Sequence, residues 1–391
     1  MFYKEKIFGS SLPPMTLCLT FDDGPGSRWD GVKPDPKKPG PKDLNPGPHT
    51  LLIAEYLKNQ GIRATFFFVG KHAAQYPDIL AKVKEFGHLI GNHTFEHPHL
   101  PSFLARNGAP FEELLRADAV IKPWVDGKIT FFRPPYGDWS PDSPELYQAL
   151  KNTLALSMNH IGPIHWDIGG SDWSHWWKWY YSHDPNEIQA CADDYLAAIK
   201  QAGDKGIILM HDSTSDMENT LRGNHTFQML QILIPQLKKM QYNFVRLDEV
   251  PDVVSRMNDP FRFALKASNS KYISPQSGGG GKIMVDGPKV GPWEPLGIED
   301  LGFGKVALRA TNGQYFSPQN GGGGAVLANA TDVDEWEPMD LVTIDQTHVA
   351  FRTVTGNWLT WNKTPDGDQL VASASLYGPP EEGVFACEVL Q

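Results

Sequence analysis

Residues 16–25 read TLCLTFDDGP, and this stretch decides how the first part of the chain is interpreted. Its apolar run, TLCLT, has the length and composition of a buried strand, and two adjacent carboxylates follow it, Asp22 and Asp23. Gly24 and Pro25 then turn the chain. At a turn both carboxylates can reach one pocket, where one can hold a metal while the other stays free as a base. An ordinary acidic turn is the alternative, because Asp-Gly marks turns of many kinds.

Strand-like and helix-like segments alternate through the first two-thirds of the chain. The strand-like runs are 16–20, 64–69, 88–92, 129–133, 161–168, 206–210 and 243–247. Amphipathic helices are expected between most of them, as in 49–60 and 77–86, which stop at Gly61 and Gly87. This alternation predicts a parallel, distorted (β/α) barrel over residues 1–258. The Pro- and Lys-rich run 32–48 is expected to be a long loop after the first strand.

An internal repeat fills the rest of the chain, residues 262–391. FALKASNSKYISPQSGGGG (263–281) matches VALRATNGQYFSPQNGGGG (306–324), and a third, more divergent copy starts at Val349. Tyr272, Tyr315 and Trp358 occupy equivalent positions, spaced by 43 residues. Repeated strand-rich units with Gly runs as turns predict a closed, three-fold, all-β domain. The repeat resembles the fascin-like β-trefoil group.

Composition narrows the class of protein and its partners. The chain is 40% hydrophobic, has 12 Trp and carries a net charge of −11, and neither half is basic, which argues against a nucleic-acid partner. No apolar stretch is long enough to span a membrane. The N-terminus shows no signal-peptide core, so both a cytoplasmic location and an exported one, after removal of a signal, stay open. Cys18, Cys191 and Cys387 lie far apart and are expected to be buried free thiols.

A pair of histidines, His93 and His97, follows the strand-like run 88–92. Their spacing predicts that both lie on one face of a helical turn, within reach of one ion. With Asp23 they would form a two-His, one-carboxylate set that leaves positions for water and substrate. Two histidines satisfied by the core or by solvent are the alternative. His99, close by, is interpreted as a bystander.

Three further clusters also follow predicted strands. Arg133 precedes two prolines that would hold it rigidly, as the orientation of a carboxylate requires. In Asp172-Trp173 the carboxylate could set the pKa of a histidine while the indole lines a cleft. His211 ends an apolar strand and is placed to donate a proton. Each alone could be structural, but the carboxyl ends of barrel strands share one face, so together they predict one active site.

The order and content of these clusters resemble the five motifs of the NodB-type polysaccharide deacetylases, carbohydrate esterase family 4. The matching segments are TFDDGP (20–25), HTFEH (93–97), RPPY (133–136), SDW (171–173) and LMH (209–211). The first two are specific, and the others are specific mainly in combination. The resemblance implies a metal-dependent hydrolase that removes N-acetyl groups from an N-acetylglucosamine-containing poly- or oligosaccharide, chitin-type or peptidoglycan, and releases acetate.

The resemblance also implies how the metal and the base are arranged. Asp23, His93 and His97 would bind a divalent metal, most commonly Zn²⁺, with Co²⁺ and Ni²⁺ as alternatives. Asp22 would be the general base that activates water, and Arg133 would orient it.

The remaining matched positions are implied to surround the substrate. The backbone N–H of Tyr136 would help to hold the oxyanion. Asp172 would tune His211, which protonates the departing amine, while Trp173 and Leu209 would shape the acetyl pocket.

One position departs from the family pattern. The fourth motif usually carries a further Asp three residues before the Asp-Trp pair, and this chain has Gly169 there. Asp167, two positions earlier, is the candidate replacement. The departure bears on the shape of the cleft and on substrate preference more than on the chemistry.

Two other functions stay open at this level: an O-acetyl esterase acting on xylan, and a catalytically silent glycan-binding protein. The C-terminal repeats could bind glycan, bind protein or merely cover the barrel. Tyr272, Tyr315 and Trp358 could be three sugar-binding platforms, or they could form a repeated core layer. The aromatic run 176–181 is either a sugar-stacking rim or packing under a loop.

Overall fold

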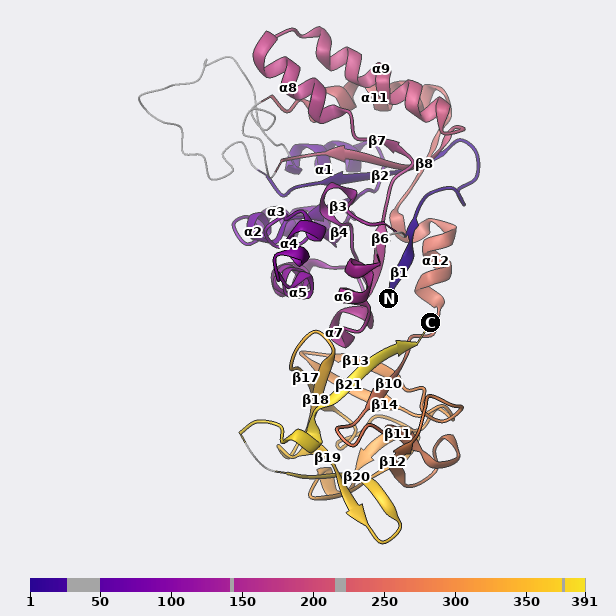
Figure 1. The fold of residues 1–391 in the computed structure, drawn as a ribbon. Helices are drawn as coiled ribbons and strands as arrows, with labels where there is room; N and C mark the ends of the chain where they lie inside the picture. Colours follow the sequence, from indigo (N-terminus) through magenta and orange to yellow (C-terminus); the bar gives the residue numbers. More distant parts are fainter. Residues whose placement is uncertain (27–49, 141–143, 215–222, 375–376, 391) are drawn as a thin grey trace. The chain divides into compact units, whose positions relative to one another are not determined.

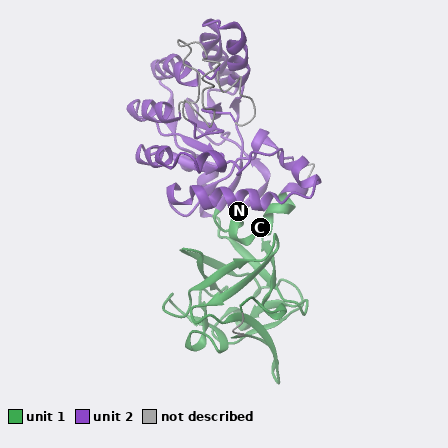
Figure 2. Cartoon of the chain, turned by 90° about the vertical axis from the view of Figure 1, so that its left-hand side faces the viewer, with its two compact units in different colours: residues 1, 147–159, 259–391 green, residues 2–146, 160–258 purple. Residues whose placement is uncertain are grey.

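The structure is a computed structural model that describes residues 1–26, 50–140, 144–214, 223–374 and 377–390. The long loop expected at 32–48 lies outside the described residues. The chain forms two compact units (Figure 2). One consists of residues 2–146 and 160–258, and the other of residues 1, 147–159 and 259–391.

The first unit is built on parallel strands. They are β1 (Phe2–Ile7), β2 (Thr16–Asp22), β3 (Thr65–Phe68), β4 (Leu89–Asn92), β5 (Thr130–Phe131), β6 (His160–Ile164), β7 (Ile168–Gly169), β8 (Lys205–His211) and β9 (Asn243–Val245). One sheet has the order β4-β3-β2-β8-β7, with β9 also paired to β2, and a second has the order β1-β6-β5. A parallel bridge between Asn92 and Phe132 joins the two sheets. The predicted barrel-like parallel fold is therefore confirmed.

Helices cover the outside of this unit. They are α1 (Thr50–Asn59), α2 (Gly70–Ala73), α3 (Pro77–Glu85), α4 (Leu100–Ala105), α5 (Pro110–Ile121), α8 (Asp172–Ser182), α9 (Asn186–Gln201), α11 (Thr226–Lys239) and α12 (Pro251–Asn258), with α6 (Glu145–Lys151) at the boundary of the units. Gly61 and Gly87, just beyond α1 and α3, have φ of +71° and +85°, the left-handed conformation that ends helices. Figure 1 shows α8, α9 and α11 together over the β7-β8-β2 part of the sheet.

The central strand β2 shows how the sequence directs side chains into the barrel. Every residue of β2 is buried, as expected for a parallel strand covered on both faces. Leu17, Leu19 and Phe21 pack in the cluster that includes the covering helices, whereas Cys18 belongs to the cluster inside the barrel. Side chains alternate along a strand, so Asp22 shares the inner face with Cys18. The strand therefore delivers a carboxylate to the inside of the barrel at its carboxyl end.

Strand β1 was not predicted from the sequence. It pairs in parallel with β6 and buries only its ends, Phe2 and Ile7, while the residues between them are partly or fully exposed. This mixed pattern, YKEK between two apolar residues, lacks the alternation that signals a strand. The predicted buried free thiols are confirmed: Cys18, Cys191 and Cys387 are all buried and unpaired.

The second unit is all β apart from short helical segments. Its strands are β10 (Arg262–Lys266), β11 (Tyr272–Pro275), β12 (Ile283–Gly287), β13 (Gly297–Gly302), β14 (Lys305–Arg309), β15 (Tyr315–Pro318), β16 (Gly324–Ala330), β17 (Met339–Thr343), β18 (His348–Thr353), β19 (Trp358–Thr364), β20 (Gly367–Ala374) and β21 (Phe385–Leu390). Successive pairings run β10-β21-β18-β17-β14-β13, and a bridge from Phe263 to Leu296 lies between β10 and the start of β13. The antiparallel pairs β11–β12, β15–β16 and β19–β20 also pair with one another through β20. The all-β nature of this unit is confirmed, and the β-trefoil assignment stays a prediction.

The repeat is visible in equivalent contacts. Lys266, Arg309 and Arg352 lie over the rings of Tyr272, Tyr315 and Trp358 respectively, at 5.6, 6.0 and 5.7 Å from the ring centroids. The Tyr272 and Tyr315 hydroxyls donate to glutamates, and Trp358 is buried. These contacts favour the interpretation of the three aromatics as a repeated structural layer.

The segment 147–159 belongs to the second unit. This assignment of the segment was not predicted from the sequence. This segment contains α7 (Leu154–Ser157), and Leu154 lies in the core of the β unit. The Thr153 hydroxyl donates to the Gln346 carbonyl at 2.9 Å, and the Asn159 amide donates to Asp300 at 2.9 Å. The β unit therefore takes part of its core from a segment that precedes it by about a hundred residues in the chain. Among the described residues, no helix is both long and apolar enough to cross a membrane.

Candidate active site

Asp22 and Asp23 stand at the carboxyl end of β2. Asp22 is the last residue of the strand, and Asp23 has a φ of +77°, so the backbone changes direction between the two side chains. Both are buried, with relative exposures of 4% and 6%. Their carboxylates would diverge along a continued strand, but the turn allows both to face neighbours at the same mouth of the barrel.

Asp22 is held by Arg133. Nη1 of Arg133 donates to Oδ1 of Asp22 at 2.7 Å and to the hydroxyl of Thr20 at 2.8 Å. Thr20 and Asp22 point to the same face of β2 because they are two residues apart. The other carboxylate oxygen of Asp22, Oδ2, lies 3.7 Å from Nε2 of His93. One oxygen is therefore used for orientation, and the other faces the histidines.

The guanidinium of Arg133 is fixed on every side. The side chain has no exposed surface, and its Nε and Nη2 atoms donate to the carbonyls of Ile164 at 3.2 Å and His165 at 3.3 Å. The Phe67 ring lies 4.3 Å from the guanidinium carbon. A planar cation with this many fixed partners has little freedom to turn, so it holds Asp22 in one orientation.

His93 and His97 lie on an irregular loop, so the predicted helical turn is wrong. Thr94 and His97 have φ of +65° and +61°, which a right-handed helix excludes. The side chain of Asn92 accepts from the Thr94 N–H at 2.8 Å, and the Glu113 carboxylate accepts from the N–H of residues 95 and 96. These side chains take the backbone donors that a helix would have used.

The loop nevertheless brings both imidazoles to Asp23. Oδ1 of Asp23 lies 3.1 Å from Nε2 of His97 and 3.5 Å from Nε2 of His93. One potential ligand atom from each of the three residues lies within 4.8 Å of the other two, and all three residues are buried. In the part of the chain that the structure describes, no other group of His, Cys, Asp and Glu meets this criterion.

The hydrogen bond of His93 indicates which nitrogen faces the site. Nδ1 of His93 lies 2.8 Å from the carbonyl oxygen of Arg133. A carbonyl can only accept, so Nδ1 donates to it and Nε2 is the ring nitrogen that faces Asp23. A metal-ligating histidine is usually held in this way, by donating its other N–H to a carbonyl or carboxylate. The donor set and its surroundings therefore fit a divalent metal.

The charge state of Asp23 also suits a cation. Burial alone would raise its pKa, but His97 and the hydrogen bonds from His93 and His97 outweigh burial and hold the pKa well below the usual range. Asp23 is thus a carboxylate across the neutral pH range. His72, which sequence reasoning missed, places Nδ1 3.0 Å from the Asp23 carbonyl oxygen and packs behind the turn.

His211 and Asp172 form a second pair at the same mouth. β2 and β8 are parallel with Asp22 opposite His211, so the ends of the two strands are neighbours. The two oxygens of Asp172 contact Nδ1 of His211 at 2.8 Å and its backbone N–H at 2.7 Å. Burial lowers the pKa of His211, but the charges of Asp172, Asp23 and Asp22 outweigh it and raise the pKa to about 10. The imidazole is therefore protonated at neutral pH and can act as an acid.

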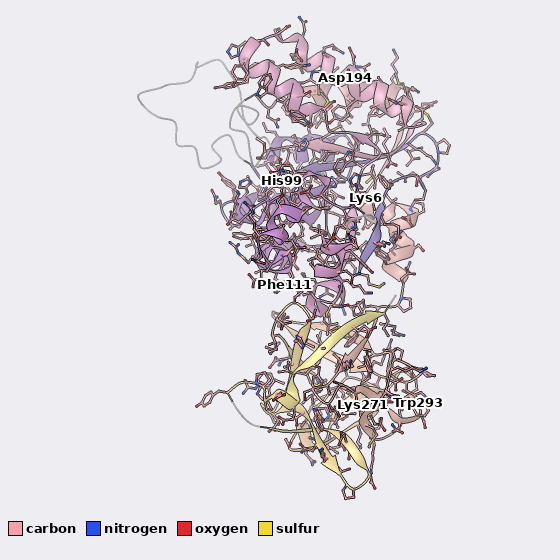
Figure 3. The ribbon with its side chains drawn as sticks, in the orientation of Figure 1. Lys6, His99, Phe111, Asp194, Lys271 and Trp293 are labelled. Carbon is pink, nitrogen blue, oxygen red and sulfur yellow. The ribbon has the colours of Figure 1, made fainter. Side chains whose placement is uncertain are left out.

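Tyr136 lies at the rim of the site. It has a φ of +57°, unusual for an aromatic residue, and its side chain is 45% exposed. Its ring centroid lies 4.7 Å from that of His97 and 3.5 Å from that of His99, with which it is stacked. His99, labelled in Figure 3, is itself exposed and is outside the Asp23–His93–His97 group. Its contact with Tyr136 is consistent with the bystander interpretation.

Asp167 does not replace the missing aspartate, so that prediction is wrong. Its Oδ2 accepts from the backbone N–H of Gly9 at 2.7 Å and of Ile207 at 2.8 Å. Ile207 is near the start of β8, at the opposite end of the strand from His211. The carboxylate is therefore used to attach the chain at Gly9 to β8.

Tyr195 of α9 occupies the space beside Gly169. A Cβ at Gly169 would lie 2.5 Å from the Tyr195 ring and 2.6 Å from the Leu209 carbonyl, and Gly169 has a φ of +100°. The Tyr195 hydroxyl donates to that carbonyl at 2.8 Å. Burial and then the charge of Asp172 raise the pKa of Tyr195 well above its usual value. Sequence reasoning missed Tyr195, because a buried Tyr on an amphipathic helix gives no local signal of such a role.

Asp212 and Thr50 support the turn after Asp23 and were also missed. The Thr50 hydroxyl donates to Oδ2 of Asp212 and accepts from the Gly26 N–H at 2.8 Å. Gly24 passes so close that a Cβ there would lie 2.3 Å from Oδ2 of Asp212. Burial raises the pKa of Asp212 to about 8. The position of Asp212 directly after His211 was the only sequence signal for it.

The two residues expected to shape the acetyl pocket differ in exposure. Trp173 follows Asp172 at the start of α8 and is 47% exposed, whereas Leu209 is buried in β8 at 4%. The structure thus brings every matched position to the carboxyl ends of the strands or to the segments that follow them.

Comparison with known proteins agrees with this geometry. Residues 9–155 match the sequence profile of the polysaccharide deacetylase family. A peptidoglycan-N-acetylglucosamine deacetylase of Bacillus cereus is 26% identical over 233 residues, which cover 59% of this chain and 66% of that protein. A chitooligosaccharide deacetylase of Azorhizobium caulinodans is 29% identical over 204 residues, covering 49% of this chain and 84% of that protein.

Among solved structures, the Bc1960 peptidoglycan N-acetylglucosamine deacetylase aligns with a TM-score of 0.41 and 24% sequence identity, covering 61% of this chain and 88% of that one. The chain therefore contains a polysaccharide deacetylase (NodB-type) domain, matched over residues 9–155, and it also carries an additional all-β unit.

Proposed function

We propose that this chain is a metal-dependent hydrolase that removes N-acetyl groups from N-acetylglucosamine-containing oligo- or polysaccharides of chitin type or from peptidoglycan. One observation supports the proposal above the others. A metal-type set (Asp23, His93 and His97), a fixed carboxylate (Asp22) and a protonated imidazole (His211) are brought to one mouth of the barrel. The relatives, a peptidoglycan-N-acetylglucosamine deacetylase and a chitooligosaccharide deacetylase, support the same substrates.

The reaction requires two difficult events. An amide carbonyl is a weak electrophile, and an unprotonated amine is a poor leaving group. Asp23, His93 and His97 would hold a divalent cation, for which we propose Zn²⁺ because two imidazoles and one carboxylate are characteristic zinc ligands. When bound, the cation supplies Lewis-acid chemistry, in that it polarises the carbonyl and lowers the pKa of water.

Asp22 is proposed as the general base. Its Oδ2 is turned toward the histidines while Oδ1 is held by Arg133, so it can take a proton from a water molecule that attacks the carbonyl carbon. Arg133 acts by positioning the carboxylate.

His211 is proposed as the general acid. It is held by both oxygens of Asp172 and is protonated at neutral pH. Its proton would go to the amide nitrogen as the C–N bond breaks, which leaves acetate and a free amine. The Tyr136 backbone, in its left-handed conformation, is proposed to direct its N–H toward the oxygen that becomes negatively charged. Trp173 and Leu209 are proposed to line the acetyl pocket.

Acetate release from a panel of substrates tests the proposal. The panel contains N-acetylglucosamine oligomers, peptidoglycan and acetylxylan, each assayed with and without a chelator. We expect release from the N-acetylated substrates, loss of release on chelation and recovery when Zn²⁺ is added back. Release from acetylxylan alone would instead support an O-acetyl esterase, and release from no substrate by the metal-loaded protein would refute the proposal.

A matched pair of variants tests the assignment of the base. Asp22→Asn keeps the shape of the side chain and should reduce acetate release by about a hundredfold or more, the usual contribution of general base catalysis, while the protein still binds Zn²⁺. Glu96→Gln is the control, because Glu96 is a half-exposed carboxylate on the same histidine loop that pairs with Arg116. Full activity of Asp22→Asn would refute the assignment.

We also propose the domain bounds 1–258 and 262–391, with residues 147–159 contributing to the core of the second domain.

A further inference from the structure

One face of α8 presents a row of aromatic side chains. The helix buries Asp172, His175, Trp176 and Trp179. The opposite face carries Trp173, Trp177 and Tyr181, spaced by four residues and exposed by 47%, 46% and 59%. Residues four apart lie one above the other on a helix, so the three rings form a continuous stripe. The outer face of a surface helix is normally polar, and an exposed apolar stripe of this kind indicates a binding surface.

The aromatic stripe (Trp173, Trp177 and Tyr181) begins at the candidate active site. Trp173 directly follows Asp172, which binds His211, and the Trp173 N–H donates to Oδ1 of Asp172 at 2.9 Å. The rings of Trp177 and Tyr181 then contact each other edge-on, with centroids 5.0 Å apart. At 1.5 Å per residue the stripe extends about 12 Å along the helix, away from the general acid. This length suits the part of a polymeric substrate that flanks the unit at which the reaction occurs.

The stripe lies on a rigid element. Trp176 donates from Nε1 to the Thr226 hydroxyl at 3.0 Å on the buried side of α8. His175 contacts two carboxylates of α9, Glu187 at 2.7 Å and Asp194, which is labelled in Figure 3, at 2.9 Å. A helix anchored in this way offers rings that lose little conformational freedom when they bind a ligand. A platform of fixed aromatics is therefore already formed before any ligand arrives.

We propose that Trp177 and Tyr181 extend the binding site beyond Trp173 and stack against sugar rings that flank the reacting N-acetylglucosamine unit. This inference rests on the proposed function. The flat faces of pyranose rings expose C–H groups that pack against aromatic rings. The Trp N–H and Tyr O–H groups can form hydrogen bonds with sugar hydroxyls. A helix that binds a membrane surface would surround its aromatics with several Lys and Arg residues, and α8 carries only Lys178. The stripe thus selects an uncharged chain of several sugar units over a single sugar.

The ratio of kcat/KM for an N-acetylglucosamine hexamer to that for the dimer tests this inference. We expect the wild-type ratio to exceed one, and Trp177→Ala to lower it by roughly threefold to tenfold, the loss of one aromatic packing interaction. The ratio should be largely restored in Trp177→Phe, which keeps an aromatic ring. Lys178→Ala is the matched control, because it truncates an exposed neighbour on the same helix that is outside the stripe.

Binding of the hexamer by the Asp22→Asn protein gives a readout that does not depend on turnover. Adding Trp177→Ala should raise the hexamer Kd by a similar factor, whereas adding Lys178→Ala should not. Equal ratios and equal Kd values with and without the Trp177 ring would overturn the inference. So would a change of oligomeric state in Trp177→Ala, measured by light scattering, because it would identify the stripe as a contact between copies of the chain.

The failure of this inference can be separated from failure of the proposed function. A wild-type protein that releases acetate from the dimer and the hexamer with equal kcat/KM retains the proposed function and refutes the role of the stripe. A wild-type protein that releases no acetate from either oligomer refutes the proposed function itself.

Discussion

Nη1 of Arg133 lies 2.7 Å from Oδ1 of Asp22, in a pair that solvent hardly reaches. A buried pair of this kind is costly to disrupt on one side only, because the remaining charge is left without a partner. The pair also divides the carboxylate into an oxygen that is fixed and an oxygen that faces the histidines. In the proposed mechanism, stability and catalysis therefore depend on the same contact.

Removing the guanidinium should reduce both stability and activity. Arg133→Met leaves the Asp22 carboxylate buried and unpaired, so we expect unfolding free energy to fall by about 3–5 kcal/mol. Urea unfolding measures this quantity. The double variant Arg133→Met/Asp22→Asn should be less destabilised than the sum of the two single variants, since they share one interaction. Strict additivity would contradict the coupling of the two residues.

The basic side of the pH profile should depend on Asp172. Asp172→Asn removes the carboxylate that does most to raise the pKa of His211 to about 10. The variant imidazole then loses its proton at lower pH, so the basic limb of kcat should move to lower pH. Acetate release at saturating metal measures this shift, and an unmoved limb would show that His211 is not the acid.

The same pair should make stability depend on pH. The folded pKa of His211, about 10, is above the ordinary value for histidine, 6.5. The stabilisation from this proton is therefore complete below about pH 6.5 and is lost as the pH rises through about 10. The difference in unfolding free energy between the wild type and Asp172→Asn should follow this course. A difference that grows as the pH rises would contradict the assigned protonation state.

Binding of Zn²⁺ should stabilise the first unit. At a free concentration a hundred times Kd the gain is about 2.7 kcal/mol, which for a unit of this size corresponds to a rise in Tm of roughly 5–10 °C. His93→Ala and His97→Ala should lose the rise. His99→Ala is the matched control, since His99 is nearby and exposed but outside the Asp23–His93–His97 group. A rise that survives in His97→Ala would show that the ion binds elsewhere.

The space beside Gly169 should not accept a side chain. A Cβ there would lie 2.5 Å from the Tyr195 ring, whereas a Cβ at Gly170 would meet its nearest atom, in the Leu209 side chain, at 3.5 Å. Both glycines have positive φ, +100° and +90°, so both alanine variants carry backbone strain. We expect Gly169→Ala to cost about 1–3 kcal/mol more than Gly170→Ala, the usual range for overpacking. Equal losses in chemical unfolding would show that Tyr195 moves aside readily.

Leu154 should stabilise the all-β unit although it precedes that unit in the chain. It is 1% exposed and lies in the core of the second unit, so Leu154→Ala should cost about 2–5 kcal/mol. Hydrogen exchange should become faster in β17 and β21, which contact α7, and stay unchanged in β2 and β8. Faster exchange in β2 and β8 instead would show that Leu154 stabilises the core of the first unit and not that of the all-β unit. Leu51→Ala, at a partly exposed leucine of α1, is the control.

Local pattern was enough to predict most of the residues that the structure brings to one mouth of the barrel. The apolar runs that end in Asp22 and His211 predict strands. Parallel strands in a barrel bring their carboxyl ends to one face, and the residues at these ends are therefore expected to be neighbours. The 43-residue repeat likewise predicted an all-β unit, because equivalent sequence produces equivalent local contacts at Tyr272 and Tyr315.

The sequence failed where a distant side chain competes with local preference. The spacing of His93 and His97 suits a helical turn, but Glu113 from α5 accepts the backbone N–H groups of the loop between them. Asp167 stands near the Asp-Trp pair in the chain, yet its carboxylate binds the opposite end of β8. Strand β1 was missed because its burial depends on pairing with β6 and not on its own alternation.

The amino-acid sequence by itself determined which residues could do the chemistry, the order of the strands that carry them, and the repeat that builds the second unit. Only the tertiary structure decided the conformation of the histidine loop, the filling of the space at Gly169 by Tyr195, and the membership of residues 147–159 in the all-β core. The physical reason is that periodicity and turn chemistry act over a few residues, whereas these three outcomes depend on contacts between segments far apart in the chain.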